Sequence, residues 1–370
     1  MQKISKIQKN FYKRLKMKKI LIQYNFILHY RKAFFNELAK YYDVTVLHSG
    51  ENSVSDEDKY KEIIVPVKKI GPFYFQSKVI SEVKKDCYDI HIALFDVRWI
   101  NTVLSIYFTN NKSQFIWWGA WITKSKIANR IRLYFTKKAD TNVFYTYEAK
   151  KDFINLGILE DNLYVANNTF DVGKRIKSYE NENKNRILFV GSLDKRKQND
   201  ILINAFSKIL SEIPKNIKLT FIGDGEERNN LENLVKEDNL KDRVEFIGRV
   251  NEAKKLQEYY KEAIVSVSFG QAGLSVLQSL GFGVPFVTKI NAISGGEKSN
   301  IINGINGIFC EDSQSSLENI LIEICNDIEY SRNMGKNAYE YYNEYCTIEN
   351  MVQGFRDAIE NTEFAKINFN

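Results

Sequence analysis

The stretch ILFVGSLDKRKQNDILINAF, residues 187–206, decides the fold that the sequence predicts. It starts with a run of large apolar residues, continues through a glycine and three consecutive basic residues, and ends in the apolar spacing of a helix. This order indicates a buried strand, a tight turn and a helix, which together form the repeating unit of a parallel sheet. The same order recurs along the chain, so we predict an α/β fold.

Apolar runs alternate with amphipathic stretches in two series. Strand-like runs lie at residues 18–25, 43–49, 89–95, 114–119 and 141–146 in the first series, and at 186–192, 217–225, 243–250, 263–269 and 284–289 in the second. Between the two series, GKRIKSYENENKN is polar and aperiodic, which is typical of a linker. We predict a basic leader at 1–16, an N-terminal Rossmann-like domain at 17–172, the linker at 173–185, a C-terminal Rossmann-like domain at 186–345 and a helical segment at 346–370, whose packing back on the N-terminal domain stays open.

The net charge of +7 is concentrated near the start of the sequence. Residues 1–19 carry eight of the 53 basic residues and no acidic residue, so the other 45 nearly balance the 46 acidic residues. This distribution, together with the lack of a recognised binding motif, argues against a nucleic-acid partner. The leader has Ile4, Ile7, Phe11 and Leu15 at helical spacing, so it is either an amphipathic helix for an anionic membrane surface or a disordered start.

The cysteines and the hydropathy pattern bear on the compartment. Four widely spaced cysteines without a Cys/His cluster suggest neither a disulfide framework nor a zinc site. The sequence has no signal-peptide-like segment and no apolar run of about 18 residues. We predict a cytoplasmic protein, with peripheral attachment to the inner face of the cytoplasmic membrane as an open alternative.

The turn inside the opening stretch has the features of an anion site. Gly191 lets the backbone turn closely, and Lys195, Arg196 and Lys197 stand where a phosphate would accept charge-assisted hydrogen bonds. The alternative is an ordinary basic surface loop, because a strand, a glycine and lysines often occur together.

A second segment, VSFGQAGLSVLQSLGFGVPFVT at residues 267–288, is rich in glycine. Gly270, Gly273, Gly281 and Gly283 flank a short helical pattern, so backbone N–H groups at the helix start could face a pyrophosphate. The alternative is a tight β-α-β connection that needs small residues for packing.

Taken together, these segments resemble the retaining glycosyltransferases of family 4, which have the GT-B fold. The second half follows that family's order of motifs: VGSLDKRK, FIGDGEERNNL, VEFIGRV, the glycine-rich segment and IINGINGIFC. The first half resembles a branch found in bacterial surface-polysaccharide synthesis, through HYRKAFFNELAKYYDVTVLHSG, WWGAW, FYTYEAKKDFINLGI and YVANNTFD. The resemblance implies two Rossmann-like doubly wound domains facing a central cleft, with the acceptor on the N-terminal side and the nucleotide-sugar on the C-terminal side.

The resemblance also assigns roles. Lys197 falls on the lysine that holds the donor diphosphate, with Arg196 as a helper. The donor-binding positions are Gly191, Ser192, Arg249, Val250, Gly270, Gln271, Ala272, Gly273, Leu274, Ser275 and Gln278. No cofactor and no metal are implied, because the nucleotide-sugar is a co-substrate.

Three departures from the family pattern occur at this site. Ser192 replaces an arginine, Gly270 and Gln278 replace two glutamates, and Ala120 replaces a histidine. They leave two interpretations open: a divergent sugar specificity, or a catalytically silent sugar-nucleotide-binding subunit of a polysaccharide assembly complex. Glu297 is our candidate for the missing carboxylate near the donor sugar, and an ordinary loop glutamate is its alternative.

Acceptor-side candidates follow the first strand and the 114–119 strand. The loop after the first strand should lie at the carboxyl edge of its sheet, which makes His29, Tyr30 and Arg31 contacts for an acceptor or a phosphate. Trp118 and Gly119, from WWGAW, belong to the same side. For His29 the alternative is a purely structural histidine.

Residues 112–138 lack any acidic residue and interleave lysine and arginine with Ile127, Ile131, Leu133, Tyr134 and Phe135. This helix either touches anionic lipid or packs its apolar side on the sheet with a solvated basic face.

The full hypothesis is a retaining hexosyltransferase that moves a sugar from a nucleotide-sugar to a glycan acceptor carried on a lipid, in bacterial surface polysaccharide synthesis.

Overall fold

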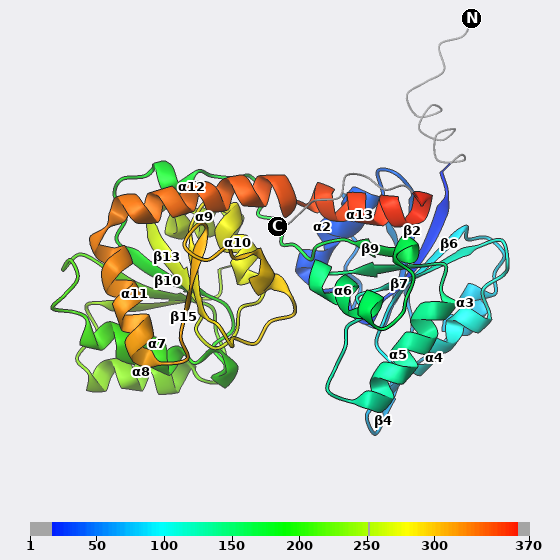
Figure 1. Ribbon diagram of the computed structural model, residues 1–370, viewed down its shortest axis with the longest axis horizontal. Coiled ribbons are helices and arrows are strands. Elements are labelled where there is room, and N and C mark those ends of the chain that lie inside the picture. The colour runs from blue at the N-terminus through cyan, green and yellow to red at the C-terminus, as the bar shows by residue number, and fades with distance from the viewer. Residues whose placement is uncertain (1–16, 251, 362–370) are drawn as a thin grey trace, which may run out of the picture. The chain divides into compact units, whose positions relative to one another are not determined.

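The computed structural model describes residues 17–250 and 252–361, shown in Figure 1. It divides into two compact units, which we call the first unit (residues 17–168 with 348–361) and the second unit (residues 169–347). The predicted linker at 173–185 lies inside the second unit. Its backbone is tied there, since Ser178 N–H donates to the Phe282 carbonyl at 3.2 Å and Asn185 N–H donates to the Glu262 carbonyl at 2.9 Å. The predicted leader lies outside the described residues.

A seven-stranded parallel sheet forms the centre of the first unit, in the order β3-β2-β1-β6-β7-β8-β9. Its strands are β1 (Lys19–Gln23), β2 (Asp43–His48), β3 (Lys61–Ile64), β6 (Ile90–Leu94), β7 (Gln114–Trp118), β8 (Thr141–Phe144) and β9 (Leu163–Val165). A separate antiparallel ribbon joins β4 (Val67–Ile70) to β5 (Phe73–Gln76). Because both faces of the sheet are covered, its strands are nearly continuous apolar runs.

The helical segments of the first unit cover both faces of that sheet. They are η1 (His29–Arg31), α2 (Lys32–Leu38), α3 (Val79–Val83), α4 (Ile100–Leu104), η2 (Ser105–Tyr107), α5 (Lys126–Lys138), α6 (Tyr147–Asn155), η3 (Glu160–Asn162) and α13 (Ile348–Glu360). Alternate residues of β7 point to opposite faces. Trp118 packs in the cluster with α2 and α13, whereas Trp117 packs in the cluster with α5 and α6.

The second unit is built around a six-stranded parallel sheet in the order β12-β11-β10-β13-β14-β15. Its strands are β10 (Arg186–Val190), β11 (Lys218–Ile222), β12 (Val244–Gly248), β13 (Ala263–Val267), β14 (Phe286–Lys289) and β15 (Gly307–Cys310). Its helical segments are η4 (Ser178–Glu180), η5 (Lys195–Lys197), α7 (Asn199–Lys208), α8 (Arg228–Glu237), α9 (Ala253–Glu262), α10 (Ser275–Gly281), η6 (Glu297–Asn300), α11 (Gln314–Asn326) and α12 (Ile328–Tyr345). The strand order reverses direction between β10 and β13, and the carboxyl edge beside such a reversal is where open α/β sheets bind ligands.

Helix α13 follows the second unit in the sequence but completes the core of the first. The ring of Phe355 is fully buried and lies 4.9 Å, centroid to centroid, from the rings of both Phe34 and Trp118. Tyr42 donates from its hydroxyl to Glu360 at 3.0 Å at the far end of the helix. Part of the predicted segment at 346–370 is therefore a structural element of the first unit.

We expect Phe355→Ala to lower the free energy of unfolding of the first unit by about 3–5 kcal/mol, because it leaves a cavity between α2, α13 and the sheet. All four tryptophans of the chain, Trp99, Trp117, Trp118 and Trp121, lie in this unit, so tryptophan fluorescence during urea unfolding reports on it selectively. Gln353→Ala, on the half-exposed side of α13, is the matched control and should change the free energy by less than about 0.5 kcal/mol. Equal effects of the two substitutions would contradict this account of the core.

Candidate functional site

Close backbone contacts between turns shape the carboxyl edge of the second sheet. Gly191 N–H donates to the Ile222 carbonyl at 2.9 Å, and Gly223 N–H donates to the Gly248 carbonyl at 2.9 Å. Gly223 has a φ of +143°, and a Cβ there would lie 1.8 Å from the carbonyl oxygen of Gly191. Only glycine fits this position, so the turns after β10 and β11 lie directly against each other.

The lysine predicted to hold a diphosphate is buried at this edge. Lys197 is 8% exposed, and its Nζ donates to the carbonyl of Gln271 at 3.4 Å. Its own carbonyl accepts from Gly270 N–H at 3.0 Å. The turn after β10 and the glycine-rich segment, 74 residues apart in sequence, thus meet at Lys197.

The charge of Lys197 has no direct counter-ion among the residues that the structure describes. Burial lowers the pKa of the Lys197 ammonium, and the charges of Asp194 and Glu297 oppose that effect while Arg196 adds to it. Within the described residues, no carboxylate lies at ion-pair distance from its Nζ. A partly desolvated cation in this state gains strongly from a nearby anion, because the interaction is weakly screened.

The neighbouring basic residue is arranged differently. Arg196 donates to both carboxylate oxygens of Asp194, at 3.2 and 3.0 Å, and its side chain is 64% exposed. Ser192 donates to the same carboxylate at 2.7 Å. Burial pushes the pKa of Asp194 upward, but these hydrogen bonds outweigh it and the net shift is downward. The Arg196 guanidinium would have to leave Asp194 before it could help a phosphate.

The two positions at which the family has glutamates are occupied in distinct ways. A Cβ at Gly270 would lie 2.2 Å from the carbonyl oxygen of Arg196, so the backbone fills the space of any side chain. Gln278 is 7% exposed, and its Oε1 accepts from the hydroxyl of buried Tyr260 at 3.3 Å. The amide nitrogen of Gln278 is therefore the part that is left to face a ligand.

The glycine-rich backbone offers fewer donors than the sequence suggests. Gly270 N–H donates to Lys197, and Ala272 N–H donates to the Ile293 carbonyl at 2.8 Å, so both groups are already used. The N–H groups of Gly273, Leu274 and Ser275, where α10 begins, donate to no acceptor in the part of the chain that the structure describes. These three donors remain for an anion at the helix start.

Glu297 follows a loop that backbone hydrogen bonds at Ile293 tie to the glycine-rich segment. Ile293 N–H donates to the Gly270 carbonyl at 3.0 Å, which closes a short bridge between the two segments. Glu297 is 8% exposed and accepts from Gly295 N–H at 2.9 Å and from the Ser294 hydroxyl at 3.2 Å. Its charge acts on the pKa of Lys197, so the two side chains share one electrostatic environment.

Several buried polar atoms in the turn after β10 and in the glycine-rich segment lack a hydrogen-bond partner within the described chain. Of the residues that carry them, Gln271 and Ser275 were singled out by the sequence analysis, whereas Gln198 and Asn199 were not. Asn199 is 4% exposed, and both polar atoms of its side chain lack a partner among residues 17–250 and 252–361, as do Gln198 Oε1, Gln271 Oε1 and Ser275 Oγ. Such groups are costly to leave unpaired and commonly mark a binding site. The only sequence signal is that Gln198 and Asn199 directly follow the basic triplet.

The remaining donor-side candidates lie after β12. Arg249 is exposed, and Val250 packs, partly buried, against the cluster formed by α9, α10 and α12. In the described chain, no group of three His, Cys, Asp or Glu side chains is placed to hold a metal ion.

The acceptor-side candidates divide into exposed and buried residues. His29 is exposed in η1, whereas Arg31 is 3% exposed with its guanidinium 5.1 Å from the ring centroid of Trp118. Arg31 also donates to Asn168 Oδ1 at 3.0 Å, and its guanidinium carbon lies 5.2 Å from the ring centroid of Tyr30. Trp118 is fully buried, so Arg31 and Trp118 are core residues here and neither presents a surface for an acceptor.

Gly119 closes the same strand with a φ of +79°, and a Cβ there would lie 2.7 Å from the ring of Tyr145. This glycine is therefore required by packing. Together with Trp118, it shows that the WWGAW segment serves the core of the first unit at these two positions.

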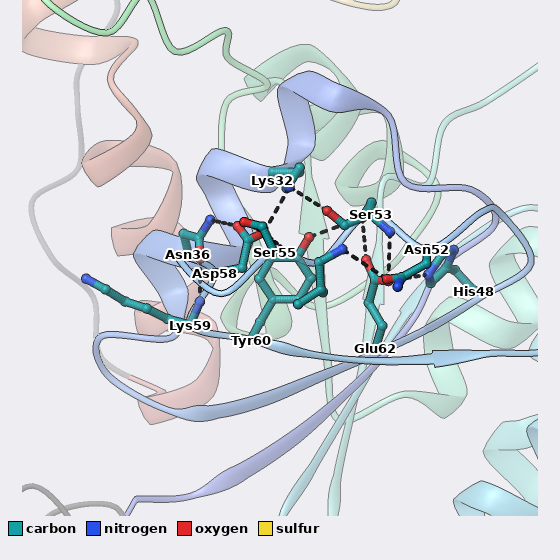
Figure 2. Close-up of polar contacts among 11 residues, drawn as sticks. Lys32, Asn36, His48, Asn52, Ser53, Ser55, Asp58, Lys59, Tyr60 and Glu62 are labelled. Carbon is teal, nitrogen blue, oxygen red and sulfur yellow. Dashed lines mark hydrogen bonds and ion pairs between the residues drawn. The ribbon is translucent and has the colours of Figure 1, made fainter.

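A polar cluster at the end of β2, shown in Figure 2, was also missed by the sequence analysis. Glu62 accepts from the hydroxyl of Ser53 and, at 3.1 Å, from its N–H, while His48 Nε2 lies 3.6 Å from the same carboxylate. Lys32 pairs with Asp58 at 2.9 Å. A carboxylate, and not the imidazole, faces the serine, so the cluster lacks the order of a hydrolytic triad and instead fixes the loop after β2.

Gly270→Ala should lower the free energy of unfolding of the second unit by about 1–3 kcal/mol, because the new methyl group has to displace the Arg196 carbonyl. Gly273→Ala is the matched control in the same segment, since a Cβ there meets nothing within 4 Å. Urea unfolding followed by far-ultraviolet circular dichroism measures both. A Gly270→Ala protein as stable as Gly273→Ala would refute the close approach of the two turns.

The chain is similar in sequence to several known proteins. Residues 173–341 match the family model described as glycosyl transferases group 1. N-acetyl-alpha-D-glucosaminyl L-malate synthase of Bacillus anthracis is 28% identical over 176 residues, which cover 47% of this chain and 45% of that protein. An alpha-1,4-N-acetyl-D-galactosaminyltransferase of Campylobacter jejuni, named for a PP-undecaprenol substrate, is 31% identical over 160 residues, covering 42% and 43%. The matches thus span less than half the length of either relative.

Among solved structures, Anabaena Alr3699/HepE in complex with UDP superposes with a TM-score of 0.71 at 15% identity, covering 93% of this chain and 100% of that one. Together with its two parallel Rossmann-like sheets, this similarity gives the chain the GT-B fold that we expected. The second unit, over residues 173–341, matches the glycosyl transferases group 1, and the chain as a whole has the GT-B fold.

Proposed function

We propose that this protein is a retaining glycosyltransferase that takes a sugar from a nucleotide-sugar and transfers it to a glycan acceptor carried on a lipid. The observation that carries the proposal is the buried Lys197 ammonium, which has no counter-ion at ion-pair distance in the described chain and lies beside the glycine-rich segment that begins α10. A nucleoside diphosphate supplies the negative charge that this site lacks. The match of this unit to the group 1 glycosyl transferases supports the same class.

Catalysis would come mainly from stabilising the leaving group. As the bond from the sugar to the diphosphate breaks, negative charge grows on the departing oxygen, and Lys197 together with the open N–H groups of Gly273 to Ser275 would meet it. Glu297 would be the carboxylate that faces the sugar or its hydroxyl groups. Gln278 would offer its amide nitrogen to the ribose, because its oxygen is held by Tyr260.

The relatives support the substrate classes. The Anabaena structure holds UDP, and the Campylobacter enzyme is named for a substrate on a polyprenyl diphosphate. We propose that the donor is a nucleotide-sugar and that the acceptor is attached to a lipid. The protein would act in bacterial surface polysaccharide synthesis, at the cytoplasmic face of the membrane. No helix of the described chain is long and apolar enough to cross a bilayer.

The first test concerns the phosphate role. We expect Lys197→Ala to weaken binding of UDP, or of whichever nucleoside diphosphate binds, by at least about tenfold in calorimetry, since a desolvated charge pair is lost. Lys195→Ala, at the exposed neighbouring lysine, is the matched control and should leave the affinity nearly unchanged. Equal affinities of Lys197→Ala and the unmodified protein would remove Lys197 from the site, and binding without any sugar transfer or donor hydrolysis would favour the silent subunit.

The second test uses pH. Binding of the diphosphate requires the charged form of Lys197, so affinity is full below the pKa of that group and falls as pH rises through it. Because burial lowers this pKa, the fall should begin at a less alkaline pH than an ordinary lysine would give. In Lys197→Arg the charge persists to high pH, so its affinity should stay flat in calorimetry from neutral to alkaline pH. Parallel curves for both proteins would show that another group titrates.

A further inference from the structure

Two stretches without acidic residues, 63–81 and 97–139, are brought together in the first unit. The backbone N–H of Tyr74, in β5, donates to the carbonyl of Arg98 at 2.8 Å. The ring of Tyr74 stacks on that of Trp99, with centroids 4.9 Å apart and planes 9° from parallel. The β4–β5 ribbon is thereby attached to the segment that leads into α4 (Figure 1).

Helix α5 presents apolar side chains to solvent. Ile127 is 74% exposed, and Ile131 and Tyr134, one and two turns further on, are also exposed. The helix packs on the unit through Phe135 and through Arg132, which are both buried. The sequence left open whether the apolar side of this helix is packed on the sheet. These exposures show that part of that side faces solvent.

A chain of aromatic contacts continues this surface toward the ribbon. The hydroxyl groups of Tyr107, at the end of η2, and Tyr134 lie 2.8 Å apart, and the Lys138 ammonium lies 4.7 Å from the ring centroid of Tyr107. Leu104 and Phe108, on either side of η2, are exposed. The elements α5, η2 and α4 therefore form one continuous surface.

The ribbon adds apolar side chains at the other end. Ile70 is 52% exposed, and Phe73 and Phe75 on the facing strand are exposed too. We call the surface made by β4–β5, α4–η2 and α5 the basic apolar surface. Exposed apolar groups gathered over several elements commonly mark an interaction site.

The charge of this surface has one sign. Exposed basic side chains lie on the ribbon and on α5, namely Lys68, Lys69, Lys126, Arg130, Lys137 and Lys138. None of these six forms an ion pair with an acidic side chain of the described chain, whereas Arg98 is paired with Asp96 at 2.6 Å. Lysines beside exposed isoleucine and aromatic rings match the negative headgroups and the apolar boundary of an anionic bilayer.

We propose that the basic apolar surface docks this protein on a bilayer that contains anionic lipid. Aliphatic side chains such as Ile70, Ile127 and Ile131 gain nothing from a phosphate backbone but gain from transfer into the acyl boundary, which favours lipid over nucleic acid. This docking concerns the first unit and needs neither the donor site nor glycosyl transfer. Its failure would therefore leave the proposed sugar transfer standing, and the reverse holds as well.

The test is flotation of the full chain with phosphatidylcholine vesicles, with and without phosphatidylglycerol. We expect binding only to the anionic vesicles, with loss of binding as salt rises. Ile127→Ser with Ile131→Ser, and separately Lys137→Gln with Lys138→Gln, should each weaken the vesicle affinity about tenfold or more.

Matched controls keep the test specific. Leu156→Ser with Leu159→Ser removes two exposed leucines of the first unit outside this surface, and Lys236→Gln with Lys241→Gln removes two exposed lysines of the second unit. Both controls should bind vesicles like the unmodified chain. Unchanged vesicle affinity in the surface variants, or binding of a DNA duplex that the same variants abolish while vesicles are ignored, would overturn the proposal.

Discussion

The contact on which the candidate site depends is a backbone hydrogen bond between two turns that are far apart in sequence. Gly270 N–H donates to the carbonyl of Lys197, and the absence of a side chain at Gly270 lets the Arg196 carbonyl occupy the adjoining space. This single approach holds the lysine side chain over the glycine-rich segment. It also explains a departure from the family pattern, because a glutamate at this position has no room unless the β10 turn moves away.

Because the two turns lie so close together, the groups that are left to contact a ligand come from elsewhere in the site. Two of the backbone donors in the glycine-rich segment are consumed by holding neighbouring loops, and the donors nearest the start of α10 stay open. Besides Asp194 in the turn after β10, a carboxylate from a later segment, Glu297, acts on the charge of Lys197, and a short bridge at Ile293 ties that segment to the glycine-rich one. Asp194 and Glu297 therefore supply negative charge near the lysine although the glycine-rich segment carries no glutamate.

The sequence predicted the two parallel sheets well, because buried strands and amphipathic helices leave a strong periodic signal at Ile187, Leu188 and Phe189 and their equivalents. Lys197 could be singled out from its place after a strand. Other features had no local signal: the pairing of Arg196 with Asp194, the burial of Arg31 over Trp118 and the exposure of Ile127 all depend on contacts between distant segments. Periodicity indicates that a helix has an apolar side, but not whether another element covers it.

The path of the chain into α13 has a consequence for biosynthesis. A ribosome releases residues in order, so most of the first unit emerges well before the helix that fills its core. Until Phe355 arrives, Phe34 and Trp118 have an uncovered apolar face, and the second unit has been made in the meantime. The nascent first unit would therefore stay open to chaperones while the second unit is synthesised, and its maturation would be coupled to completion of the second.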